Sequence, residues 1–76
     1  MTITLKPLTA YVSREGNIAT IEIKNEQGDT VLTQHHHELQ TKLNPAEVVS
    51  DNLAQMKMMG LNLVALETTM PGVELR

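Results

Sequence analysis

The residues with the most chemical potential in this chain are three consecutive histidines, His35, His36 and His37. In an extended strand, side chains two positions apart lie on the same face, so His35 and His37 could bind one metal ion while His36 points to the other face. Zinc normally needs three or four protein ligands, and the candidate carboxylates, Glu47 and Glu67, are distant in sequence. A metal-binding regulator or metal-dependent enzyme that uses His35 and His37 with Glu47 or Glu67 is therefore the alternative hypothesis.

A simpler interpretation is a partly exposed strand end whose imidazoles hydrogen-bond to the backbone of nearby loops, and we prefer it. No spacing designates further metal ligands, because Glu38 shares the face of His36 rather than that of the other two histidines. A third interpretation is an edge or interface that responds to pH, since imidazole changes charge near neutral pH. We accordingly expect no cofactor.

Other catalytic motifs are missing from the sequence. Ser13 and Ser50 lie in no nucleophile-elbow or triad-like context. The four glycines are isolated and form no phosphate-binding loop. The chain has no cysteine, which excludes thiolate chemistry and Cys-based metal sites. We therefore expect that the protein is not an enzyme.

Composition narrows the class of partner. The net charge is -3, the six basic residues are scattered, and Tyr11 is the one aromatic residue. Nucleic-acid binding usually needs a concentrated cationic surface and aromatic stacking platforms, so we do not expect a nucleic-acid partner. The N-terminal sequence has no continuous apolar run that would predict a signal or a membrane span. Together with the absence of cysteine, this leads us to expect a cytoplasmic protein.

Three strands are predicted in the first half of the chain. Period-2 alternation and β-branched residues indicate strands over 8–14, 17–25 and 30–39, separated by turns that contain Gly16 and Gly28. In the third strand, Val31, Thr33, His35 and His37 are predicted on one face, and Leu32, Gln34 and His36 on the other.

A helix is predicted from Pro45 to Met59. Asn44 is the expected N-cap, Glu47 can return a capping-box hydrogen bond, and Gly60 is the expected C-terminal cap. An apolar stripe at three- and four-residue spacing should pack on the sheet; it contains Ala46, Val49, Leu53 and Met56.

A final strand is predicted over 61–68, with Leu61, Leu63 and Ala65 on one face and Val64 and Leu66 on the other. Because both faces are apolar, we expect this strand in the interior of the sheet. The 76 residues should form a single domain, 1–76, with peripheral segments at 1–7 and 69–76.

The order of elements predicts an α+β fold, βββαβ, with a small mixed sheet in the order 3-2-1-4 and one helix packed on one face. This topology is similar to the core of ribonuclease H-like domains and to several small bacterial and phage folds. A catalytic version of that resemblance implies acids on the first strand, the helix and the last strand. Glu47 and Glu67 occupy two such places, but the first strand has Ser13 and Arg14 where an acid is required. The resemblance is therefore one of topology and carries no activity.

The apolar residues that the helix cannot cover suggest how the protein acts. Leu32, Val64 and Leu66 are predicted on the sheet face opposite the helix, and Met58 on the outer side of the helix. Because exposed apolar surface is costly, we predict that these four residues form an interface with a protein partner or with a second copy in a homodimer. Our hypothesis is a non-enzymatic binding or accessory protein that acts through protein–protein contacts. Small acidic inhibitors and accessory factors of phages and plasmids are a class-level analogy.

Overall fold

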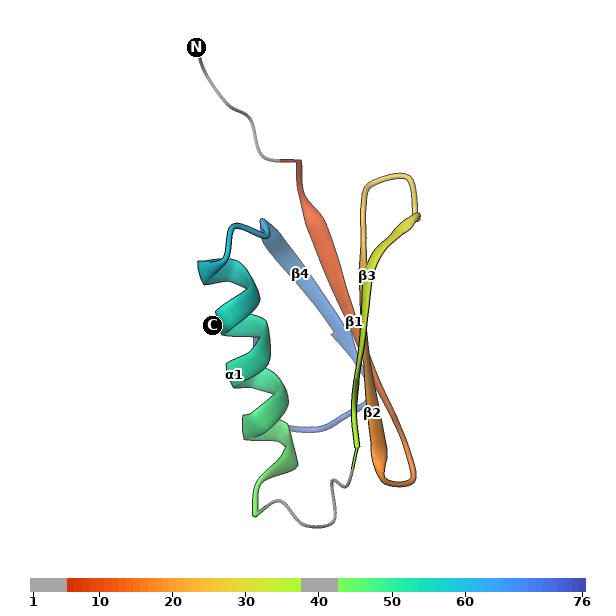
Figure 1. Ribbon diagram of the computed structural model, residues 1–76, viewed down its shortest axis with the longest axis vertical. Coiled ribbons are helices and arrows are strands. Elements are labelled where there is room, and N and C mark those ends of the chain that lie inside the picture. Colours follow the sequence, from red (N-terminus) through yellow and green to blue (C-terminus); the bar gives the residue numbers. More distant parts are fainter. Residues whose placement is uncertain (1–5, 38–42) are drawn as a thin grey trace.

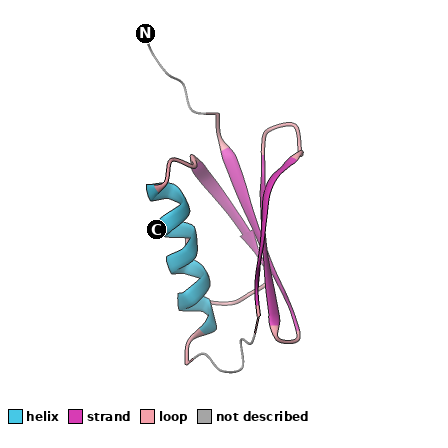
Figure 2. Ribbon diagram, in the orientation of Figure 1, coloured by secondary structure: helices cyan, strands magenta, loops and turns pink. Residues whose placement is uncertain are grey.

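The computed structural model describes residues 6–37 and 43–76, in which one helix packs against one face of a four-stranded sheet (Figures 1 and 2). The elements are, in chain order, β1 (Leu8–Glu15), β2 (Ile18–Lys24), β3 (Thr30–His36), α1 (Pro45–Met58) and β4 (Leu63–Thr68). This arrangement confirms the predicted α+β class and the order βββαβ.

The sheet has the strand order β3-β2-β1-β4, as predicted. β1 pairs with β2 and β2 with β3 in antiparallel ladders, whereas β4 is parallel to β1 because the chain crosses over through α1. β4 is an edge strand of this sheet, so the prediction of an interior position was wrong. Val64 and Ala65 of this strand are exposed, Leu66 is partly buried, and only Leu63 is buried.

Local capping explains both ends of α1. The Asn44 side chain accepts a hydrogen bond from the backbone N–H of Glu47 at 3.2 Å, and Pro45 occupies the first helical position. At the other end, Gly60 has a φ of 107°, its N–H donates to Lys57 O, and Leu61 N–H donates to Met56 O. These two bonds form a Schellman motif with Met59 as the C-cap residue. The helix ends at Met58, one residue before the predicted end.

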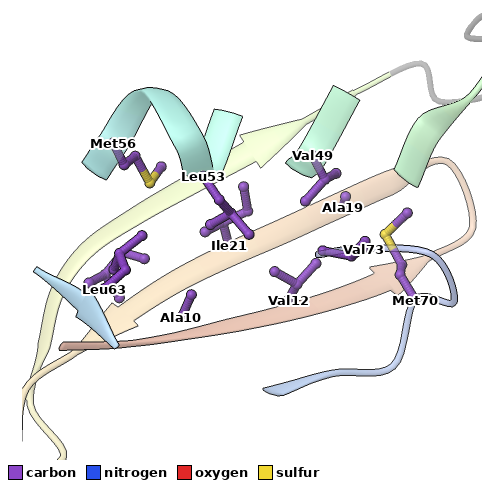
Figure 3. Close-up of a cluster of buried hydrophobic side chains, with 11 residues drawn as sticks. Ala10, Val12, Ala19, Ile21, Val49, Leu53, Met56, Leu63, Met70 and Val73 are labelled. Atoms are coloured by element: carbon purple, nitrogen blue, oxygen red, sulfur yellow. The ribbon is translucent and has the colours of Figure 1, made fainter. Parts of the chain in front are cut away.

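The core lies between α1 and the sheet (Figure 3). The predicted helical stripe is confirmed, because Val49, Leu53 and Met56 are buried and Ala46 packs against them. Alternate residues of β1 and β2 supply the other side of this layer: Ala10, Val12, Ala19, Ile21 and Ile23. The core is aliphatic throughout, so its stability depends on close packing of small side chains rather than on aromatic area.

The C-terminal segment is part of this core, in contrast to the predicted peripheral position of residues 69–76. Met70 and Val73 are 4% and 8% exposed, and they extend the apolar layer beside Val12 and Val49 (Figure 3). The chain then runs along α1, and its C-terminal end lies beside the helix (Figure 1). Of the other predicted peripheral segment, residues 1–5 lie outside the described part, as do residues 38 and 39 of the predicted third strand.

No helix within the described ranges is long and apolar enough to cross a membrane.

Candidate functional site

The sheet face opposite α1 is mostly polar. Strand pairing places Tyr11 of β1 between Glu22 of β2 and Glu67 of β4, while Thr20 pairs with His35. The Lys24 ammonium lies 5.2 Å from the centre of the Tyr11 ring and 3.9 Å from Glu22 Oε2. We predicted an apolar surface on this face, and its described residues are instead mostly polar.

Leu66 and Leu32 lie on the face opposite to the predicted one, for different reasons. In β4, Leu8 pairs with Leu63 but Thr9 pairs with Ala65, so Val64 is an extra residue and Leu66 turns toward the helix. In β3, Leu32 alternates with its neighbours as predicted, but it pairs with the buried Ile23, so its face is the helix face. Lys24 pairs with Thr30, so Val31 is an extra residue that precedes Leu32 and does not change its face. Leu32 and Leu66 therefore share the face of the core, opposite to their predicted face.

The four predicted interface residues do not form one patch. Leu66 is half-buried and packs against the core, and Val64, 57% exposed, lies at the β4 edge. Met58 is 87% exposed on α1. Leu32, 38% exposed, lies on β3 at the opposite edge of the sheet from Val64. Of the four, Leu32 lines a surface groove between β3 and α1.

This groove, which we call the β3–α1 groove, runs between β3 and the C-terminal half of α1. Its volume is about 530 Å³, and its lining residues are Leu32, Thr33, Gln34, Asn52, Gln55, Met56, Met59 and Leu61. None of these side chains carries a charge. The Schellman motif at the end of α1 brings Leu61 back beside Met56 and leaves Met59 86% exposed at the rim. The groove was not predicted from the sequence, because its lining residues come from β3, α1 and the turn after α1.

The three histidines are arranged as their strand spacing predicts. His35 and His37 lie on the open face of the sheet, with ring centroids 6.3 Å apart, and His36 pairs with Ala19 on the helix face. His35 Nδ1 lies 3.1 Å from Thr20 Oγ1 on the neighbouring strand. A hollow of about 560 Å³ on this face is lined by Glu15, Ile18, Thr20, His35 and His37.

The carboxylates proposed as partners of the histidines lie elsewhere. Glu67 is on β4, three strand spacings from β3, which is about 14 Å. Glu47 is on α1, on the other side of the sheet, where its carboxylate accepts a 2.5 Å hydrogen bond from Arg76 Nη2. This hydrogen bond is the main cause of a lowered pKa for Glu47. No group of three His, Cys, Asp or Glu side chains that could hold a metal ion occurs among residues 6–37 and 43–76.

Comparisons of the chain with protein-family models, with curated proteins and with solved structures find no match. The geometry of the described residues is therefore the basis for assigning a function.

Proposed function

We propose that the chain is a non-enzymatic binding protein that acts through protein–protein contacts, and that it is a homodimer joined along the outer edge of β3. The observation that carries this proposal is the position of an edge strand directly beside the uncharged β3–α1 groove. A strand from another chain that pairs with β3 can satisfy the backbone groups at this edge and cover Leu32 and Met59 in the same step.

The edge of β3 lacks the features that usually prevent strand addition. Natural edge strands often carry lysine, proline or inward-pointing charges, or a bulge that twists the edge away. The bulge at Val31 interrupts the first part of β3, but Leu32–His36 continues without lysine, arginine, proline or a carboxylate. This second part lies beside the groove, which Leu32 and Gln34 line. It is therefore the part of the edge that a partner strand can extend.

Charge complementarity supports a second copy as the partner. Glu26 and Asp29 lie in the hairpin that precedes β3, whereas His35, His36 and His37 lie at its end. Antiparallel pairing of two β3 strands around a twofold axis brings the acidic hairpin of each copy next to the histidines of the other. Imidazole donates hydrogen bonds to carboxylates and attracts them when it is protonated. One chain thus supplies both complementary ends, as an isologous interface requires.

The energetics predict a dimer of moderate affinity. Met59 is 86% exposed and Leu32 38% exposed, and full burial of an exposed aliphatic side chain stabilises by at most about 1.5–3 kcal/mol. Two copies contribute two of each, while association costs about 4–15 kcal/mol in lost freedom. The backbone hydrogen bonds between the two β3 strands must supply the part of the association cost that burial of these side chains does not offset. We therefore expect the dimer to dissociate on dilution.

Light scattering and sedimentation equilibrium between one and several hundred micromolar test the proposal. We expect the mass to rise from one chain toward two with concentration. Leu32→Lys should hold the protein at one chain, because a lysine on the edge strand places a charge in the groove and must be desolvated on pairing.

Val64→Lys is the matched control. Val64 is also an exposed apolar residue at a sheet edge, but it lies on β4, so this variant should dimerise like the wild type. If Val64→Lys dissociates the dimer while Leu32→Lys does not, the interface is at β4 and the proposed edge is wrong. A wild-type mass of one chain at the highest concentration contradicts the homodimer.

A further inference from the structure

We propose that His35 and His37 form a two-imidazole binding site for one divalent late transition-metal ion. This site binds Cu²⁺ more tightly than Ni²⁺ or Zn²⁺. The site lies on the open face of the sheet, in the hollow lined by Glu15, Ile18, Thr20 and the two histidines. Both ligands come from one chain, so the site does not require a second copy, although in the proposed dimer the acidic hairpin of the other copy lies next to these histidines.

The two imidazoles are already close to a chelating arrangement. Their ring centroids are 6.3 Å apart and their planes are inclined by 47°. With metal–nitrogen distances of about 2.0–2.1 Å and ligands at 90–110°, the two centroids lie about 4.5–5.2 Å apart. Side-chain rotations close this small difference without a change in the backbone, because both residues are exposed.

Thr20 prepares His35 for metal binding. Histidine ligands usually use their second ring nitrogen for a hydrogen bond that fixes the ring orientation. The Thr20 hydroxyl lies 3.1 Å from His35 Nδ1 and can accept a hydrogen bond from Nδ1–H, which leaves the Nε2 lone pair to bind a metal ion. Thr20 is held opposite His35 by the β2–β3 ladder, so this contact is built into the sheet. Thr20 is a positioning residue in this site and not a ligand.

The donor set determines the class of ion. Two neutral nitrogen ligands favour late first-row ions, with Cu²⁺ the strongest in the usual affinity order, and they offer little to Mg²⁺ or Ca²⁺, which prefer oxygen. The Glu15 carboxylate lines the same hollow and adds negative charge near the ion. Within the described residues, no third protein ligand completes the set. Water or an external ligand therefore occupies the remaining coordination positions, and the site is open.

Isothermal titration of the full chain with CuCl₂, NiCl₂, ZnCl₂ and MgCl₂ tests the proposal, together with electron paramagnetic resonance of the Cu²⁺ complex. We expect one Cu²⁺ per chain with micromolar affinity, a spectrum that indicates nitrogen ligands, weaker binding of Ni²⁺ and Zn²⁺, and no heat from Mg²⁺. His35→Ala and His37→Ala should each abolish the Cu²⁺ isotherm. Thr20→Val should weaken it about tenfold, in the range seen when a hydrogen-bond partner of a metal ligand is removed.

His36→Ala is the internal control, because His36 lies on the opposite face of the same strand. This variant should keep the Cu²⁺ affinity of the wild type, and circular dichroism should show that all four variants remain folded. An equal loss in His36→Ala, or unchanged binding in His35→Ala or His37→Ala, overturns the site. Tighter binding of Zn²⁺ than of Cu²⁺ contradicts the two-imidazole donor set.

Discussion

The Ser50 hydroxyl accepts a 2.9 Å hydrogen bond from the backbone N–H of Glu74 and thereby joins the buried face of α1 to the C-terminal segment. Ser50 is completely buried, and it is the one buried polar residue among the described residues. Its position within the apolar stripe of the helix is explained by this bond, because a buried hydroxyl without a partner is costly.

Replacement of Ser50 by alanine should destabilise the protein by about 0.5–1.5 kcal/mol, the usual net contribution of one hydrogen bond, since the Glu74 N–H loses the acceptor of a partly buried bond. Urea unfolding monitored by circular dichroism measures the loss. Ser13→Ala, at an exposed position of β1, is the control and should lie within about 0.5 kcal/mol of the wild type. Equal stability of Ser50→Ala and wild type would indicate that water can replace the hydroxyl.

Leu53→Ala should be the most damaging truncation in α1, with a loss of about 2–5 kcal/mol. Leu53 is completely buried at the centre of the core, so the substitution leaves a cavity between the helix and Ile21 (Figure 3). Met58→Ala is the matched control, because Met58 is 87% exposed and its truncation leaves no cavity. Thermal melts of the two variants should differ clearly, and similar melting temperatures would contradict the described phase of the helix.

The ion pair between Arg76 and Glu47 should make stability depend on acidic pH. The hydrogen bond from Arg76 lowers the pKa of Glu47 below its ordinary value of 4.5; desolvation opposes this shift, and the charge of Arg76 adds to it. A carboxyl with a lowered pKa in the folded state stabilises the fold above about pH 4.5, and this contribution disappears as pH falls through the lowered pKa.

An NMR titration of the Glu47 side chain should therefore show a higher midpoint in Arg76→Gln than in the wild type. Arg14→Gln is the control, because the Arg14 guanidinium donates a 2.9 Å hydrogen bond to Gly16 O and, unlike Arg76, is not a cause of the lowered pKa of Glu47. This variant should leave the Glu47 midpoint unchanged. A midpoint insensitive to Arg76 would show that the ion pair does not persist in solution.

Gly72→Ala should be more destabilising than Gly28→Ala. Both glycines have positive φ values, 87° and 85°, so both substitutions carry a similar backbone penalty. A Cβ on Gly72 would lie 3.2 Å from Ala46 Cβ, whereas nothing lies within 4 Å of a Cβ on Gly28. The difference between the two free energies of unfolding, measured in urea, isolates the contact between the C-terminal turn and α1. No difference would mean that the turn moves away from Ala46 at little cost.

Much of the fold is determined by local sequence signals. Asn44, Pro45 and Gly60 define the two ends of α1 because capping and left-handed backbone conformations depend on the residue itself and its near neighbours. The period-2 alternation predicted over 17–25 is also a local signal, and the apolar residues on one face of it, Ala19, Ile21 and Ile23, are buried in the structure. The spacing of His35 and His37 likewise predicted that they share a face, which is the basis of the proposed metal site.

The tertiary structure alone decided which residues are available for contact. The bulge at Val64 turned Leu66 to the helix face, because one extra residue reverses every later side chain of a strand and leaves no signature in the period-2 pattern. Strand pairing, which the alternation does not contain, put Leu32 on the same face by placing it opposite Ile23. The burial of Met70 and Val73 was equally hidden, since the C-terminal segment has no regular period and is held by non-local contacts to α1. The β3–α1 groove combines residues about 20–30 positions apart, and its shape follows from the packing of the helix over the sheet, which a pattern confined to neighbouring residues does not contain.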